Sequence, residues 1–218
     1  MARNLRPTAL YDVFAVCFVA FLLLSNIGAT KLIEIGALTF DGGAILFPLT
    51  YIIGDVLSEV YGFQKARRAI FLGFIISVIA SLVFWIIIQL PPHPEYTSQA
   101  AFEQVLGVVP RFVAASLFAY LIGQLLNSWV LVKVKERWGE GHLWVRLVSS
   151  TVVGEFFDSL IFCIIAWVGT ASVATIANLT VVGFAYKVGV EILLLPLTYF
   201  VIGLVKRRER EYLSDVEQ

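Results

Sequence analysis

The sequence predicts an all-α integral membrane protein with six transmembrane helices, and three observations lead to this prediction. Hydrophobic residues other than glycine make up 59% of the 218 residues and charged residues only 15%, whereas soluble domains have about 45–50% apolar residues, glycine included, and about 25% charged residues. Six apolar runs are long enough to cross a bilayer. Basic residues fall almost entirely on alternate connections between these runs. We therefore expect residues 1–218 to form a single polytopic membrane domain.

The predicted spans cover residues 8–25, 43–61, 69–90, 111–132, 145–168 and 179–205. The first follows two arginines and so resembles a secretory signal, but no small-x-small cleavage site follows it, and we take it as a membrane helix. The sixth is 27 residues long and contains Pro196, which removes a backbone donor. A kink is therefore expected in the last span.

Two connections on the outer side are longer than the others. Residues 26–42 predict either a small β-hairpin or an unwound re-entrant segment. Residues 90–110 begin with Leu-Pro-Pro-His-Pro, which breaks a helix and predicts a loop at the water interface.

The basic residues predict the orientation, because Lys and Arg collect in short cytoplasmic connections. Thirteen of the sixteen lie on one side of the predicted membrane, so both termini are expected to be cytoplasmic. The thirteen are Arg3, Arg6, Lys65, Arg67, Arg68, Lys133, Lys135, Arg137, Arg146, Lys206, Arg207, Arg208 and Arg210.

Three of the spans contain pairs of ionisable residues three or four positions apart, which places each pair on one helix face. The pairs are Asp55 with Glu59, Glu155 with Asp158, and Lys187 with Glu191. An ionisable group at the centre of a membrane helix costs about 2.5–3.5 kcal/mol on insertion scales. These side chains are therefore expected to face the protein interior or a water-filled cavity.

The simplest interpretation is structural: Lys187 and Glu191 neutralise one another, and the other carboxylates bond to backbone, Gln124, Asn127 or serines. However, five carboxylates share one lysine, which leaves an acidic excess able to bind a proton, a cation or a polar N–H edge. Glu59 lies nearest the cytoplasmic end of its span, where carboxylates are common. Asp12 and Arg111 lie near span ends and are expected to reach the lipid headgroups.

Aromatic residues and glycines accompany these charges. Phe47 and Tyr51 precede Asp55, and Tyr186 precedes Lys187. Rings beside carboxylates suit a flat, N–H-rich heterocycle, which stacks on the rings and donates to the carboxylate. Gly54-Asp55 and Gly154-Glu155 place similar carboxylate pairs on oppositely directed spans, as a three-plus-three inverted repeat would require.

Residues 25–32, 40–74 and 152–162 resemble the queuosine precursor transporter family, also called vitamin uptake transporters, and the likeness extends over essentially the whole chain. The resemblance implies import of 7-cyano-7-deazaguanine and 7-aminomethyl-7-deazaguanine across the inner membrane, so that queuosine tRNA modification proceeds by salvage. The excess of carboxylates within the spans makes a secondary transporter the main hypothesis. By similarity, and with Glu191 added from the acidic set, the substrate-binding candidates are Asn26, Lys31, Tyr51, Asp55, Glu59, Glu155, Asp158, Lys187 and Glu191.

The expected partners are the 7-deazapurine, the lipid bilayer and, as coupling ion, the proton; an oligomer is compatible with the sequence. No nucleic-acid partner, cofactor, metal or catalytic residue is expected. One alternative is a substrate-binding membrane subunit of an ATP-driven vitamin uptake complex, whose ATPase would be another chain because no P-loop is present. A second alternative, an intramembrane aspartyl-type enzyme, lacks the full GxGD signature.

Overall fold

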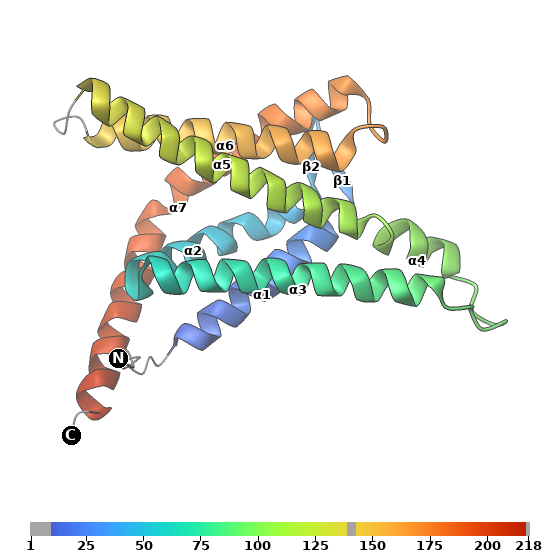
Figure 1. Ribbon diagram of the computed structural model, residues 1–218, viewed down its shortest axis with the longest axis horizontal. Coiled ribbons are helices and arrows are strands. Elements are labelled where there is room, and N and C mark those ends of the chain that lie inside the picture. Colours follow the sequence, from blue (N-terminus) through green and yellow to red (C-terminus); the bar gives the residue numbers. More distant parts are fainter. Residues whose placement is uncertain (1–9, 139–142, 217–218) are drawn as a thin grey trace.

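The computed structural model describes residues 10–138 and 143–216, and within them six helices are long and apolar enough to cross a membrane. Helices α3, α5 and α6 lie close to the long axis of the molecule, and the start of α1 and the end of α7 lie at the same end (Figure 1). The spanning helices are α1 (Tyr11–Gly28), α2 (Phe47–Tyr61), α3 (Phe63–Gln89), α5 (Val109–Trp138), α6 (Leu143–Trp167) and α7 (Val173–Val216). The prediction of six spanning helices is confirmed, and the protein is a multi-pass membrane protein. The orientation of the termini and the inverted repeat stay predictions.

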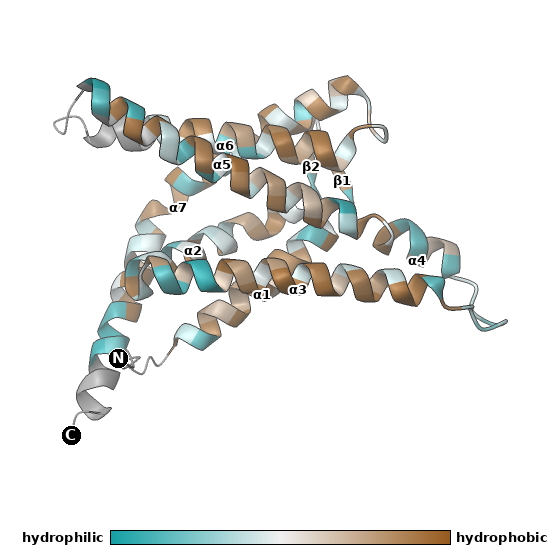
Figure 2. Cartoon of the chain, in the orientation of Figure 1, coloured by the Kyte–Doolittle hydropathy of each residue, from teal (hydrophilic) through white to brown (hydrophobic). Residues whose placement is uncertain are grey.

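Apolar residues cover most of the length of these helices, and polar residues collect toward their ends and on the loops (Figure 2). Several helices nevertheless extend past the predicted spans, since α3 begins at Phe63 and α7 continues to Val216. Hydropathy detects where a chain meets lipid, but a charged helix can continue into water. The short α4 (Gln99–Leu106), which the sequence pattern did not predict, lies in the connection between α3 and α5.

The sixth span contains Pro196, where a kink is predicted. Pro196 lies inside α7, which remains one helix. In Figure 1 the red second part of α7 descends more steeply than its orange first part, so the helix changes direction along its length.

The connection after α1 is a β-hairpin, which decides between the two predicted alternatives. Strands β1 (Leu32–Ile35) and β2 (Leu38–Asp41) pair antiparallel, with Leu32 opposite Asp41. Gly36 has a φ of 63°, a conformation that tight hairpin turns need and that glycine adopts without strain. The hairpin lies beyond the end of α1, away from its start (Figure 1), and the 3₁₀ helix η1 (Gly42–Leu46) leads from it into α2.

Helices α1, α2 and α3 pack together, α5 and α6 form a close antiparallel pair, and α7 joins the two groups. The first part of α7 packs on α6, where Leu179 shares a buried cluster with Ala166 and Trp167. Its later part packs on α2, where Ile202 and Val205 contact Val56. Helix α7 therefore contacts both groups along its length.

Arg111 has a different role from the interfacial one predicted for it. Its Nε donates to the carbonyl oxygen of Ile165 at 2.6 Å, and its Nη2 donates to the carbonyl oxygen of Val168. The last carbonyls of a helix have no partner within the helix. Arg111, near the start of α5, therefore caps the end of α6 instead of extending to lipid headgroups.

Candidate functional site

The centre of the candidate site is Lys187 on α7, which lies against two carboxylates of α6. Its Nζ is 2.5 Å from Asp158 Oδ2 and 3.8 Å from Glu155 Oε2. Only 8% of Lys187 is exposed. The lysine thus forms ion pairs with another helix, whereas the structural interpretation paired it with Glu191 one turn away.

The two carboxylates are fixed by the contact between α5 and α6. Glu155 and Asp158 are three residues apart and share one face of α6. Gly154, immediately before Glu155, lies so close to α5 that a Cβ at this position would be 3.0 Å from the carbonyl oxygen of Gly123 and 2.9 Å from Cβ of Asn127. The backbones of α5 and α6 therefore approach closely at this glycine, and a larger residue there would push the two helices apart.

Helix α2 completes the cluster with two aromatic side chains. The Tyr51 hydroxyl donates to Glu155 Oε2 at 3.3 Å, and the ring of Phe47 lies 5.1 Å from Lys187 Nζ. An ammonium near a ring face is attracted by the ring quadrupole. The cluster of Tyr51, Glu155, Asp158 and Lys187 therefore joins three helices and combines both charge signs with aromatic rings.

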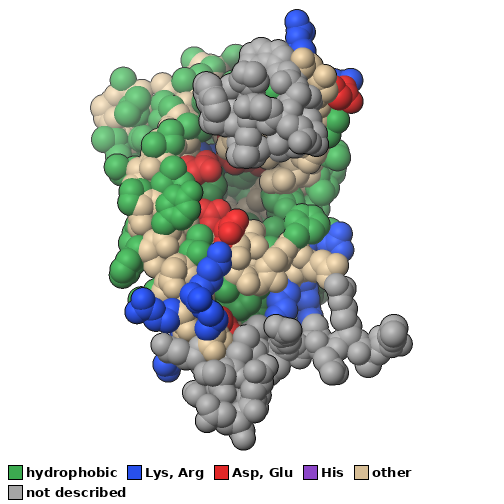
Figure 3. Space-filling view, turned by 90° about the vertical axis from the view of Figure 1, so that its left-hand side faces the viewer, with side chains coloured by type: hydrophobic (Ala, Val, Ile, Leu, Met, Phe, Trp, Pro, Cys, Tyr) green, Lys and Arg blue, Asp and Glu red, His purple; other side chains and the backbone are tan. Residues whose placement is uncertain are grey.

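Two further predicted residues lie farther along α2 and α7, toward the end that carries the start of α1. Glu191 interacts electrostatically with Glu155 and with Asp55. Figure 3 looks at this end and shows acidic side chains in a hollow between the two groups of helices, with Lys and Arg around its lower edge. Acidic side chains are thus visible from this end of the molecule.

Three of the predicted residues do not join the cluster. The Glu59 side chain is 65% exposed and lies 3.6 Å from Lys206 Nζ. Asn26 is buried, and its Nδ2 donates to the carbonyl oxygen of Leu22 in its own helix. Lys31 is exposed before the hairpin. Their contact with substrate stays a prediction.

Asp41 belongs near the site but was missed by the sequence analysis. It ends β2, its Oδ1 accepts the backbone N–H of Gly43 at 2.9 Å, and it interacts electrostatically with Lys187. Burial raises the pKa of the Asp41 carboxyl, and this effect exceeds the lowering by Lys187 and by the backbone hydrogen bonds. Asp is a common helix N-cap residue, so its position before η1 gave no sign in the sequence of a role in the site.

The hairpin is anchored to α7 by Asn178. The Asn178 Oδ1 accepts the backbone N–H of Thr39 at 3.0 Å, and its Nδ2 donates to the carbonyl oxygen of Ala37 at 3.0 Å. The Asn178 side chain thus forms hydrogen bonds with two backbone groups of the hairpin. The hairpin lies on the side of the cluster away from the hollow.

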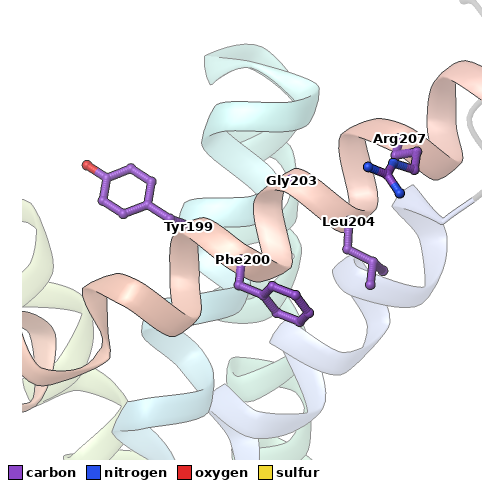
Figure 4. A pocket seen from close by; sticks show the side chains of 5 residues that line it. All are labelled: Tyr199, Phe200, Gly203, Leu204 and Arg207. Carbon is purple, nitrogen blue, oxygen red and sulfur yellow. The ribbon is translucent and has the colours of Figure 1, made fainter.

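Other features do not provide a competing site. Within residues 10–138 and 143–216, no group of three or more His, Cys, Asp or Glu side chains is placed to hold a metal ion. A shallow groove on α7 is lined by Tyr199, Phe200, Gly203, Leu204 and Arg207 (Figure 4). None of the intramembrane carboxylates lines it, so it is separate from the cluster.

Comparison with known proteins places the chain among membrane transporters. The family described as "Putative vitamin uptake transporter" matches residues 41–201, which include α2 and both charged pairs of α6 and α7. A "Probable queuosine precursor transporter" of Bacillus subtilis is 28% identical over 85% of this chain and 82% of its own length. A protein of the same description from Haemophilus influenzae is 27% identical over 78% and 72%, and the "Queuosine precursor transporter" of Escherichia coli is 29% identical over 57% and 54%. No solved structure matches. The matched family is one of transporters and not of enzymes, and the chain belongs to the vitamin uptake transporter family.

Proposed function

We propose that the protein imports queuosine precursors, 7-cyano-7-deazaguanine and 7-aminomethyl-7-deazaguanine, across the inner membrane for tRNA modification. The names of its relatives support this class of substrate. The observation that carries the proposal is the cluster of Lys187, Asp158, Glu155 and Tyr51, which is held between three helices beside the hollow.

The contacts within the cluster suggest a role for each side chain. Asp158 is engaged by Lys187 at 2.5 Å, whereas Glu155 has only longer contacts, at 3.3 and 3.8 Å. Glu155 is therefore the better acceptor for the two N–H groups of a guanine-like edge, because one carboxylate can accept both. Lys187 has further donors for the carbonyl oxygen of the base.

The aromatic residues of α2 supply the apolar part of the proposed site. The rings of Phe47 and Tyr51 lie with centroids 6.4 Å apart and are tilted by 39°. A flat base can stack on such rings, a contact worth about 1–3 kcal/mol per base in nucleic-acid complexes. Recognition then combines stacking on α2 with hydrogen bonds to α6 and α7.

The experiment is uptake of labelled precursor by cells that cannot synthesise it. Glu155→Gln and Asp158→Asn remove one charge each and keep the side-chain shape. We expect uptake to fall by at least about tenfold in Glu155→Gln, since a lost charged hydrogen bond costs about 1.5–3 kcal/mol. Glu59→Gln is the matched control, because Glu59 is exposed and away from the cluster, and its uptake should stay near that of wild type. Unchanged uptake in both cluster variants, at equal protein levels, would exclude the proposed site.

A proton as coupling ion and the absence of an ATPase partner are parts of the same proposal. The purified chain, reconstituted alone into liposomes, should accumulate precursor when a proton gradient is applied. Accumulation that ignores the gradient contradicts proton coupling. Accumulation only with an added ATPase supports the ATP-driven alternative, which no feature of the described residues favours.

A further inference from the structure

Asp41 is a third carboxylate near Lys187, and it comes from the hairpin instead of a membrane helix. The residues on either side of it are held against α7. The ring of Phe40 makes an edge contact with the ring of Tyr186, with centroids 5.6 Å apart, and the Tyr186 hydroxyl donates to the carbonyl oxygen of Ala44 at 3.2 Å. Because Tyr186 directly precedes Lys187, these contacts keep Asp41 next to the helical turn that carries the lysine.

The charges around Lys187 do not balance. Asp158 and Glu155 contact it directly, and Asp41 acts on it through space. The three carboxylates exceed the single ammonium by two charges when all are ionised, and Glu191 adds to the excess through its interaction with Glu155. A ligand with a positive charge reduces this imbalance, and a neutral ligand of the same shape does not.

The local geometry allows the charge of Asp41 to be removed without removing its structural contact. Asp41 Oδ1 accepts the Gly43 N–H, which caps η1. Asparagine offers an amide oxygen for the same bond and is an equally good cap. The effect of the charge on ligand choice can therefore be separated from its effect on the fold.

We infer that Asp41 is a specificity-determining residue, whose charge makes the site favour a 7-deazapurine bearing a primary ammonium over the same ring bearing a neutral nitrile. This inference rests on the proposed function. The ammonium of the favoured ligand is stabilised by the acidic excess to which Asp41 contributes, while the base edge is bound by the other carboxylates.

The experiment compares the binding of 7-aminomethyl-7-deazaguanine and 7-cyano-7-deazaguanine to the purified full chain in detergent at pH 7. Wild type should bind the aminomethyl compound about tenfold more tightly, as expected for a partly screened charge interaction. Asp41→Asn should lose most of this preference, with affinity for the cyano compound within about twofold of wild type. Glu34→Gln is the control, because Glu34 is an exposed carboxylate on the other strand of the same hairpin; it should keep the preference.

Each outcome distinguishes this inference from the proposed function. Equal binding of both compounds by wild type overturns the inference and leaves the function standing, and no binding of either compound overturns both. An Asp41→Asn variant that keeps the preference, or that loses both ligands equally, also overturns the inference. If Asp41→Asn does not accumulate, Asp41→Glu, which retains the charge, must keep the preference.

Discussion

Replacement of Lys187 by Met tests whether the lysine neutralises the α6 carboxylates. At an effective dielectric constant of about 20, charges separated by the observed 2.5 and 3.8 Å attract by about 7 and about 4 kcal/mol. Desolvation of the buried groups offsets most of this attraction. Removal of one partner from a buried pair costs about 3–5 kcal/mol, because the remaining charge has no counter-ion. The Asp158 and Glu155 side chains are each 24% exposed, so we expect the lower end, about 3 kcal/mol.

The assay is thermal unfolding of the purified protein in detergent. A loss of about 3 kcal/mol should lower the Tm by about 6–12 °C in a chain of this size. The double variant Lys187→Met with Asp158→Asn should recover at least half of the loss, because it removes the carboxylate in closest contact as well. Lys206→Met is the control, since the Lys206–Glu59 pair is exposed and such pairs contribute about 0–1 kcal/mol. The reasoning is refuted if Lys187→Met is as stable as Lys206→Met, or if the double variant recovers nothing.

Two further predictions concern the hairpin. Asn178→Ala removes two hydrogen bonds, each worth about 0.5–1.5 kcal/mol, so the amides of β1 and β2 should exchange hydrogen about tenfold faster; unchanged exchange would show that Asn178 does not anchor the hairpin. The pKa of Asp41 is raised above its ordinary value of 3.8 by burial, so its protonated form stabilises the fold below that value, and this contribution is lost as the pH rises through the folded-state pKa. Asp41→Asn should therefore match wild type in stability at about pH 3.5 and exceed it at about pH 7. A stability difference that stays constant between these pH values contradicts the raised pKa.

The membrane part of the fold could be predicted from hydropathy and charge, because a bilayer requires long apolar helices and short polar connections. Helix ends in water could not be predicted in this way. The charged residues 206–210 continue α7 although they lie past the predicted span. The choice of a hairpin depended on Gly36, whose positive φ suits a tight turn but does not by itself exclude a re-entrant segment.

The site was predictable in composition but not in its pairing. Burial cost singled out Glu155, Asp158 and Lys187 as residues that must face the interior, and the structure brings these three together. The pairing of Lys187 depends on distances between helices, which the sequence does not give. The four-residue spacing within one helix predicted Glu191 as its partner, whereas the structure pairs it with Asp158 and Glu155. Asp41 escaped attention because it lies outside the apolar runs, where a charged residue is unremarkable in sequence.

The cap that Arg111 places on α6 has a consequence for biogenesis. The carbonyl oxygen of Ile165 accepts a hydrogen bond from Arg111, which lies 54 residues earlier in the chain and is therefore synthesised first. When α6 enters the bilayer, the donor for its exposed carbonyls is therefore already present on α5, and the cost of unsatisfied backbone groups in hydrocarbon is avoided once the two helices lie side by side. We therefore expect helices α5 and α6 to insert as one helical hairpin, in which the contact at the end of the second helix forms last.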